Sequence, residues 1–77
     1  MKCMCEIYSV ILYELKRNGG SMNEKELYEA VAKRLEDFEI ELTPRDLNKA
    51  LLVLEARGLI TVAVLKKNMR MVKLLSA

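Results

Sequence analysis

The stretch from Thr43 to Leu75 restricts the fold more than any other part of this 77-residue chain. It begins with Thr43-Pro44, a pair typical of a helix start. The threonine hydroxyl can cap a free backbone N–H, and proline in the first turn lacks the N–H that would otherwise need a partner. Asp46 follows in the first turn, where the helix dipole favours negative charge. Gly58 stands where glycine commonly ends a helix. We therefore predict a helix between Thr43 and Gly58.

Two apolar, β-rich runs follow this helix, Leu59–Leu65 and Met69–Leu75. The residues between them are Lys66-Lys67-Asn68, and Asn68 tolerates the positive φ of a tight turn. We expect a β-hairpin with Lys67-Asn68 at its turn. Its solvent end should be basic, because Lys66, Lys67 and Arg70 lie near the turn whichever face points inward. The face of Arg70, Val72 and Leu74 and the face of Met71, Lys73 and Leu75 would exchange with a one-residue change of register.

The helix after Pro44 is expected to have two different faces. Its inward stripe at helical spacing is Leu47, Ala50, Leu51 and Leu54. The opposite stripe is Arg45, Asn48, Lys49, Leu52 and Ala56. Arg45 and Lys49 lie one turn apart, so both can meet phosphates or the floor of a DNA major groove, and asparagine can pair with adenine. Leu52 and Val53 fit a DNA contact poorly and suit a protein contact better.

The first helix is expected from about Cys3 to Arg17. Its inward stripe is Met4, Ile7, Tyr8, Ile11 and Leu15. Val10, Leu12 and Tyr13 fall outside that stripe, so the helix is apolar on more than one side. A three-helix core is too small to cover so much apolar surface. We interpret the spare face as a candidate homodimer contact.

A second helix is expected after the break at Asn18-Gly19-Gly20. Ser21-Met22 leaves room only for a brief extended segment. Asn23 is a suitable N-cap, and Glu26 can reach back to complete a capping box. The predicted core face is Leu27, Val31, Leu35 and Phe38, with Ala30 beside them. The acidic residues between these positions are expected to face water.

The charge of +2 hides an asymmetry. Gly20–Glu41 has seven acidic and three basic residues, a net charge of −4, whereas Leu42–Ala77 has seven basic and two acidic residues, a net charge of +5. A protein that binds a polyanion through its last helix and hairpin would benefit from this division, because the acidic half can face away. Two merely solvated faces would explain the same charges equally well.

Length and composition indicate a single domain, residues 1–77, and disfavour several other classes. No apolar run approaches the roughly 18 to 20 residues that span a bilayer, and Glu6 and Glu14 interrupt any signal peptide. We expect a cytoplasmic protein without membrane insertion. Cys3 and Cys5 offer at most two zinc ligands, and there is no histidine. We favour reduced thiols over a metal shared by two Cys-Met-Cys segments of a dimer. Because the sequence has no histidine, nucleophile motif or phosphate-binding loop, we expect that the protein is not an enzyme and binds no cofactor.

Taken together, these elements resemble a winged helix-turn-helix domain, of the stand-alone type found in prokaryotic transcription regulators. The resemblance covers essentially the whole chain, and its strongest matches are Leu54 to Ile60 and the Arg70-x-Val72-x-Leu74 strand. It implies an α+β, mainly α fold of three helices with a C-terminal β-hairpin wing. It also implies double-stranded DNA as the partner. The residues implied to contact DNA are Arg45, Asn48 and Lys49 in the major groove, and Lys66, Lys67 and Arg70 on the backbone or minor groove.

Winged helices also act as protein-interaction modules, so two functions stay open. A DNA-binding regulator is favoured by the basic C-terminal half and by Arg45 and Lys49. A module in a replication, transcription or membrane-remodelling complex is favoured by Leu52, Val53 and the wide apolar face of the first helix. We favour the regulator.

Overall fold

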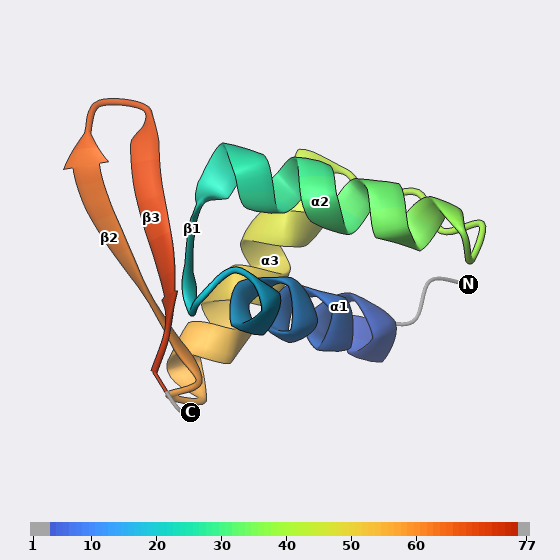
Figure 1. Cartoon of the computed structure of the whole chain (residues 1–77), viewed down its shortest axis with the longest axis horizontal. Helices are drawn as coiled ribbons and strands as arrows, with labels where there is room; N and C mark the ends of the chain where they lie inside the picture. The colour runs from blue at the N-terminus through green and yellow to red at the C-terminus, as the bar shows by residue number, and fades with distance from the viewer. Residues whose placement is uncertain (1–3, 76–77) are drawn as a thin grey trace.

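The computed structural model describes residues 4–75, which form three helices and three strands (Figure 1). In chain order these are α1 (Met4–Arg17), β1 (Ser21–Asn23), α2 (Glu24–Glu36), α3 (Pro44–Ala56), β2 (Ile60–Lys66) and β3 (Met69–Leu74). This arrangement confirms the predicted α+β, mainly α fold with a hairpin after the third helix. Within the described range, no helix combines the length and apolar character needed to cross a membrane.

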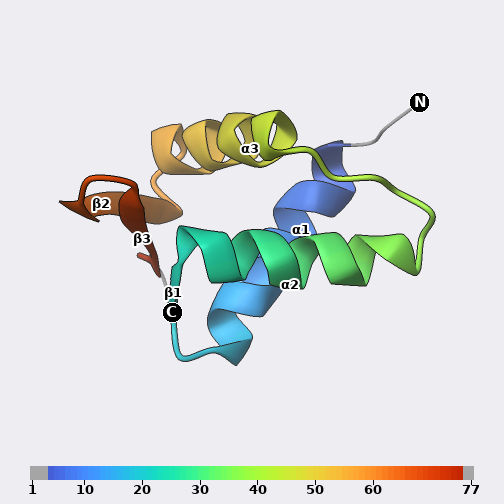
Figure 2. The same cartoon turned by 90° about the horizontal axis from the view of Figure 1, so that it is seen from above.

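The hydrophobic core lies where α1 packs against both other helices (Figures 1 and 2). Its buried apolar residues are Ile7, Ile11 and Leu15 from α1, Leu27, Val31 and Leu35 from α2, Leu47, Ala50, Leu51 and Leu54 from α3, and Leu42, Ile60 and Val72. The predicted inward stripe of α3 is therefore confirmed in full. In α1, Met4 and Tyr8 are half-buried at the edge of the core.

The sheet is antiparallel with the strand order β1-β3-β2. β3 pairs with β2 in the hairpin and also with β1, where Met22 lies opposite Val72. The brief extended segment expected at Ser21-Met22 is thus a third strand, which ties the hairpin to the start of α2. The hairpin stands at one end of the helices, with its turn pointing away from α1 (Figure 1). We call β2, β3 and their turn the wing.

The starts of α2 and α3 are capped by side chains. Thr43 Oγ1 accepts a hydrogen bond from the Asp46 backbone N–H at 3.1 Å, and Asp46 accepts one from the Thr43 N–H at 3.4 Å. This capping box fixes the first turn of α3. Asn23 caps α2 as predicted, but it accepts from the N–H of Lys25 at 2.8 Å in place of the expected box with Glu26.

The prediction that Phe38 belongs to the core was wrong, because its side chain is 61% exposed. α2 ends at Glu36, so the helical spacing that would carry Phe38 inward stops before reaching it. The chain then turns through Glu39, whose φ is +58°. Leu42, from the same connection, is buried against the core instead.

One charged side chain, Glu14 of α1, is buried within the described part of the chain, with 1% of its surface exposed. Its carboxylate accepts hydrogen bonds from Arg34 Nε at 2.6 Å and from Arg17 Nη1 at 3.3 Å. The Arg34 guanidinium also lies over the Tyr13 ring, 4.7 Å from its centre. The hydrogen bond with Glu14 raises the pKa of Arg34 above its ordinary value. A charged pair therefore joins α1 to α2.

Candidate nucleic-acid interface

The outward face of α3 carries three of the residues predicted to contact DNA. Arg45, Asn48 and Lys49 are all exposed, whereas the opposite face of the helix is buried in the core. The capping box described above holds the turn from which Arg45 projects. Two cations and an amide therefore stand together on a rigid helix.

The turn of the wing carries two further predicted residues, Lys66 and Lys67, and both are exposed. Asn68 takes a φ of +68°, as expected for the turn. The pairing register shifts between Val64 and Lys66, so the strand pairing is irregular just before the turn. Within residues 4–75, no ion pair engages Lys66 or Lys67. Both charges can therefore meet a partner.

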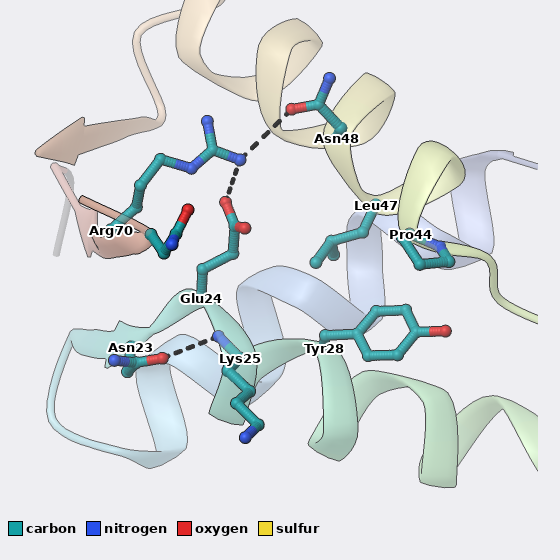
Figure 3. A pocket seen from close by; sticks show the side chains of 9 residues that line it. Asn23, Glu24, Lys25, Tyr28, Pro44, Leu47, Asn48 and Arg70 are labelled. Carbon is teal, nitrogen blue, oxygen red and sulfur yellow. Dashed lines mark hydrogen bonds and ion pairs between the residues drawn. The ribbon is translucent and has the colours of Figure 1, made fainter. Parts of the chain in front are cut away.

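Arg70 lines a hollow near the turn together with Lys66 and Lys67, but its guanidinium is paired. It lies on the same face of β3 as the buried Val72, so its side chain turns toward the helices (Figure 3). Its Nη2 atom forms an ion pair with Glu24, the first residue of α2, and donates a hydrogen bond to Asn48 Oδ1 at 3.4 Å. Arg70 therefore lies beside the two lysines as predicted, but unlike them it is ion-paired and half-buried. Burial of Val72 sets the register, and the register turns Arg70 inward.

These contacts enclose an open cleft of about 310 Å³ between the wing, the start of α2 and the first half of α3 (Figure 3). The residues that line it are Asn23, Glu24, Lys25, Tyr28, Pro44, Leu47, Asn48, Asn68 and Arg70. The Tyr28 hydroxyl donates a hydrogen bond to the Leu42 carbonyl at 2.9 Å, which holds α2 to the connection before α3. The exposed face of α3 and the tip of the wing thus flank one cleft.

Glu24 is the acid that sequence reasoning missed at this cleft. Its carboxylate would repel a phosphate, but the ion pair with Arg70 offsets its charge. Two other acids lie on α3: Asp46 belongs to its cap, and Glu55 accepts a hydrogen bond from the Val62 backbone N–H of the wing at 3.3 Å. Basic side chains therefore prevail on the outer parts of the interface, at α3 and at the tip of the wing.

The residues proposed for protein contacts differ in exposure. Leu52 is 57% exposed on the outward face of α3, whereas Val53 is half-buried. The wing adds two exposed apolar side chains, Val64 and Leu65, of which Val64 is 70% exposed. Exposed apolar side chains therefore occur on both elements that carry the basic residues.

The three residues predicted for a dimer contact do not form one face. Val10 and Leu12 are half-buried against the core, and Tyr13 is exposed but has Arg34 over its ring. Val10 lines a hollow with Phe38, while Leu12 lines a different groove with Leu59, Leu74 and Leu75. Any contact through α1 would have to span both hollows.

Cysteine and carboxylate groups suggest no metal centre in the described range. No group of three or more candidate ligands comes together there. Cys5 is exposed at the start of α1, and Cys3 lies outside the described residues.

No protein family, curated protein or solved structure matches the chain.

Proposed function

We propose that the protein binds double-stranded DNA as a small cytoplasmic regulator of transcription. In this proposal α3 enters the major groove and the tip of the wing contacts the backbone. The observation that carries it is the hydrogen bond between Arg70 and Asn48, which joins the wing to the outward face of α3. The cations of α3 and of the wing therefore stand on two elements that meet at one cleft. A major groove about 12 Å wide admits an α-helix.

The two sets of cations are suited to different contacts. Lys66 and Lys67 stand at a hairpin tip, where they can neutralise phosphates without any packing role. Arg45, Asn48 and Lys49 stand on a capped helix, where side chains are held well enough to contact base edges. The net charge of +5 over Leu42–Ala77 further supports a polyanionic partner.

A salt titration of DNA binding tests the role of the wing. The protein would be titrated into labelled duplexes of random and genomic sequence, and the affinity measured by fluorescence anisotropy. Replacing Lys66 and Lys67 by Ala should weaken all sequences alike. Each lost phosphate contact should lower the slope of log K against log salt by about 0.9.

The matched control replaces Lys16 and Lys33 by Ala, because these exposed lysines lie on α1 and α2. It removes the same charge and should leave the salt slope unchanged. Equal effects of the two double variants would point to net charge alone. A wild-type protein that binds no duplex even at low salt would contradict the proposal.

Base reading would be tested on the helix. Single Ala variants of Arg45, Asn48 and Lys49 should narrow the gap between preferred and random DNA. A bidentate base contact is worth about 1 to 3 kcal/mol of discrimination. If the variants lower the affinity for preferred and random DNA equally, these residues contact phosphates and not base edges.

The second candidate function is a protein-interaction module, and the exposure of Leu52 favours it. Leu52→Lys separates the two functions. On the DNA proposal the variant keeps or gains affinity, because it adds a cation to the groove-facing stripe. On the protein proposal it abolishes partner binding, because it buries an unpaired charge. The second proposal would replace the first if Leu52→Lys abolished a protein complex and none of the polar substitutions above changed the affinity for DNA.

We also propose a homodimer formed through α1. Its support is the exposed ring of Tyr13 and the two apolar hollows on either side, at Val10 and at Leu12. Sedimentation at micromolar concentration should give about twice the monomer mass. A monomer whose mass does not change with concentration would contradict this part of the proposal.

A further inference from the structure

The ion pair between Glu24 and Arg70 restricts what Arg70 can bind. A guanidinium can grip guanine or phosphate with two parallel N–H groups, either from Nη1 and Nη2 or from Nε and Nη2. Each of these two-nitrogen contacts uses a hydrogen of Nη2. Here Nη2 faces the Glu24 carboxylate and also donates to Asn48 Oδ1 (Figure 3). Nη2 is therefore engaged by two groups at once, and a two-pronged contact of Arg70 with DNA would have to displace one of them.

The same contact orients the Asn48 side chain. Its Oδ1 faces Arg70, and its Nδ2 points away from the guanidinium (Figure 3). At 3.4 Å the bond is long, but the flipped amide would set N–H groups against the N–H groups of Arg70. The attraction between Oδ1 and the Arg70 N–H group therefore selects one orientation of the Asn48 amide. Asn48 presents donors to the outside.

This orientation changes the base that Asn48 can read. Pairing with adenine requires the amide to accept from N6 and donate to N7 at once. Oδ1 keeps a second lone pair, but it faces the positive charge of Arg70 and is a poorer acceptor for another N–H, whereas the two Nδ2 hydrogens point away from the guanidinium. Guanine presents two acceptors, O6 and N7, on its major-groove edge, whereas cytosine presents a donor there. An amide that offers its donors more readily than its acceptor suits guanine best.

We propose that Arg70 is a positioning residue that makes Asn48 select guanine over adenine, with Glu24 holding Arg70 in place. The proposal rests on the DNA-binding function proposed above. It gives Glu24 a use at a surface where a lone acid would only weaken binding. It also replaces the expectation from the sequence that Asn48 pairs with adenine.

The test is a selection from a randomised duplex library, followed by affinity measurements on the selected duplex with each base in turn. Asn48→Ala identifies the base pair that Asn48 reads, because preference is lost at that position. At this position wild type should favour guanine. Arg70→Met keeps the length of the side chain but removes its donors, so the amide is free to turn. The guanine-to-adenine affinity ratio should then fall about tenfold or more.

Two further variants make the result specific. Lys73→Met removes one positive charge from the other face of β3, where Lys73 is exposed, and should leave the base preference unchanged. Glu24→Gln loosens Arg70 without removing it, and should shift the preference toward adenine by a smaller factor. If Arg70→Met does not fold, as judged by circular dichroism, the Glu24→Gln result decides.

Several outcomes would overturn the inference while DNA binding itself stands. These are an adenine preference in wild type at the Asn48-dependent position, no such position at all, or a guanine preference that survives both Arg70→Met and Glu24→Gln. Failure of wild type to bind any duplex is a different result, because it removes the proposed function and the inference together.

Discussion

Replacing Glu14 by Gln would measure what the buried charge contributes to stability. The carboxylate is 1% exposed and accepts one short hydrogen bond, 2.6 Å from Arg34, and one long bond, 3.3 Å from Arg17. Glutamine keeps the size and the buried position of the side chain. The substitution therefore removes the charge and leaves the packing of α1 against α2 intact.

The expected loss follows from the two bonds that Glu14 accepts. A hydrogen bond to a charged group contributes about 1.5 to 3 kcal/mol, and a neutral one about 0.5 to 1.5 kcal/mol. Neutralising Glu14 should therefore cost about 1 to 1.5 kcal/mol at the short bond. The long bond comes from a largely exposed side chain and adds only about 0.3 kcal/mol. A total near 1.5 kcal/mol would lower Tm by roughly 6 to 12 °C in a domain of this size.

Urea and thermal unfolding followed by circular dichroism would test this value. Glu29→Gln is the matched control, because Glu29 is exposed on α2 and should change stability by less than about 0.5 kcal/mol. A Glu14→Gln protein as stable as wild type, or more stable, would refute the reasoning. It would mean that desolvation of the carboxylate cancels what its two partners provide.

Three other substitutions test local features by the same unfolding assays. Thr43→Ala removes the hydroxyl that caps α3 and should lower the free energy of unfolding by about 1 kcal/mol; an unchanged midpoint would show that the cap is dispensable. Asn68→Val places a β-branched residue at a φ of +68° and should cost about 1 to 2 kcal/mol, whereas Asn68→Gly should not destabilise the wing. Phe38→Ser should change stability by less than about 0.5 kcal/mol, because the ring is exposed; a loss of about 3 kcal/mol or more would restore it to the core.

The features predicted best from the sequence are those set by residues close together in the chain. Thr43-Pro44 and Asp46 specify the start of α3 through contacts within one turn, so their pattern could be recognised directly. The same holds for Gly58 after that helix, with a φ of +76°, and for Asn68 in the turn. Elements whose signals are local therefore appeared where expected.

The misses all depend on residues far apart in the chain or on where an element stops. Phe38 continues the apolar spacing of α2, but no sequence signal showed that the helix ends at Glu36. The partners of Arg70 come from α2 and α3, so no spacing rule connects them. The candidate site was accordingly predicted as two groups of cations. Glu24, the acidic residue between these two groups, was not predicted as part of the site.

The central place of β3 in the sheet bears on the order of folding. Its contact with β2 closes a short hairpin, a process of about 1 to 10 μs. Its contact with β1 pairs Ser21 with Lys73, and this closes a loop that contains both α2 and α3. Such closure costs more chain entropy and is repaid only when the enclosed helices have packed. The hairpin can therefore form early, but it becomes anchored to α2 late, when β1 joins the sheet.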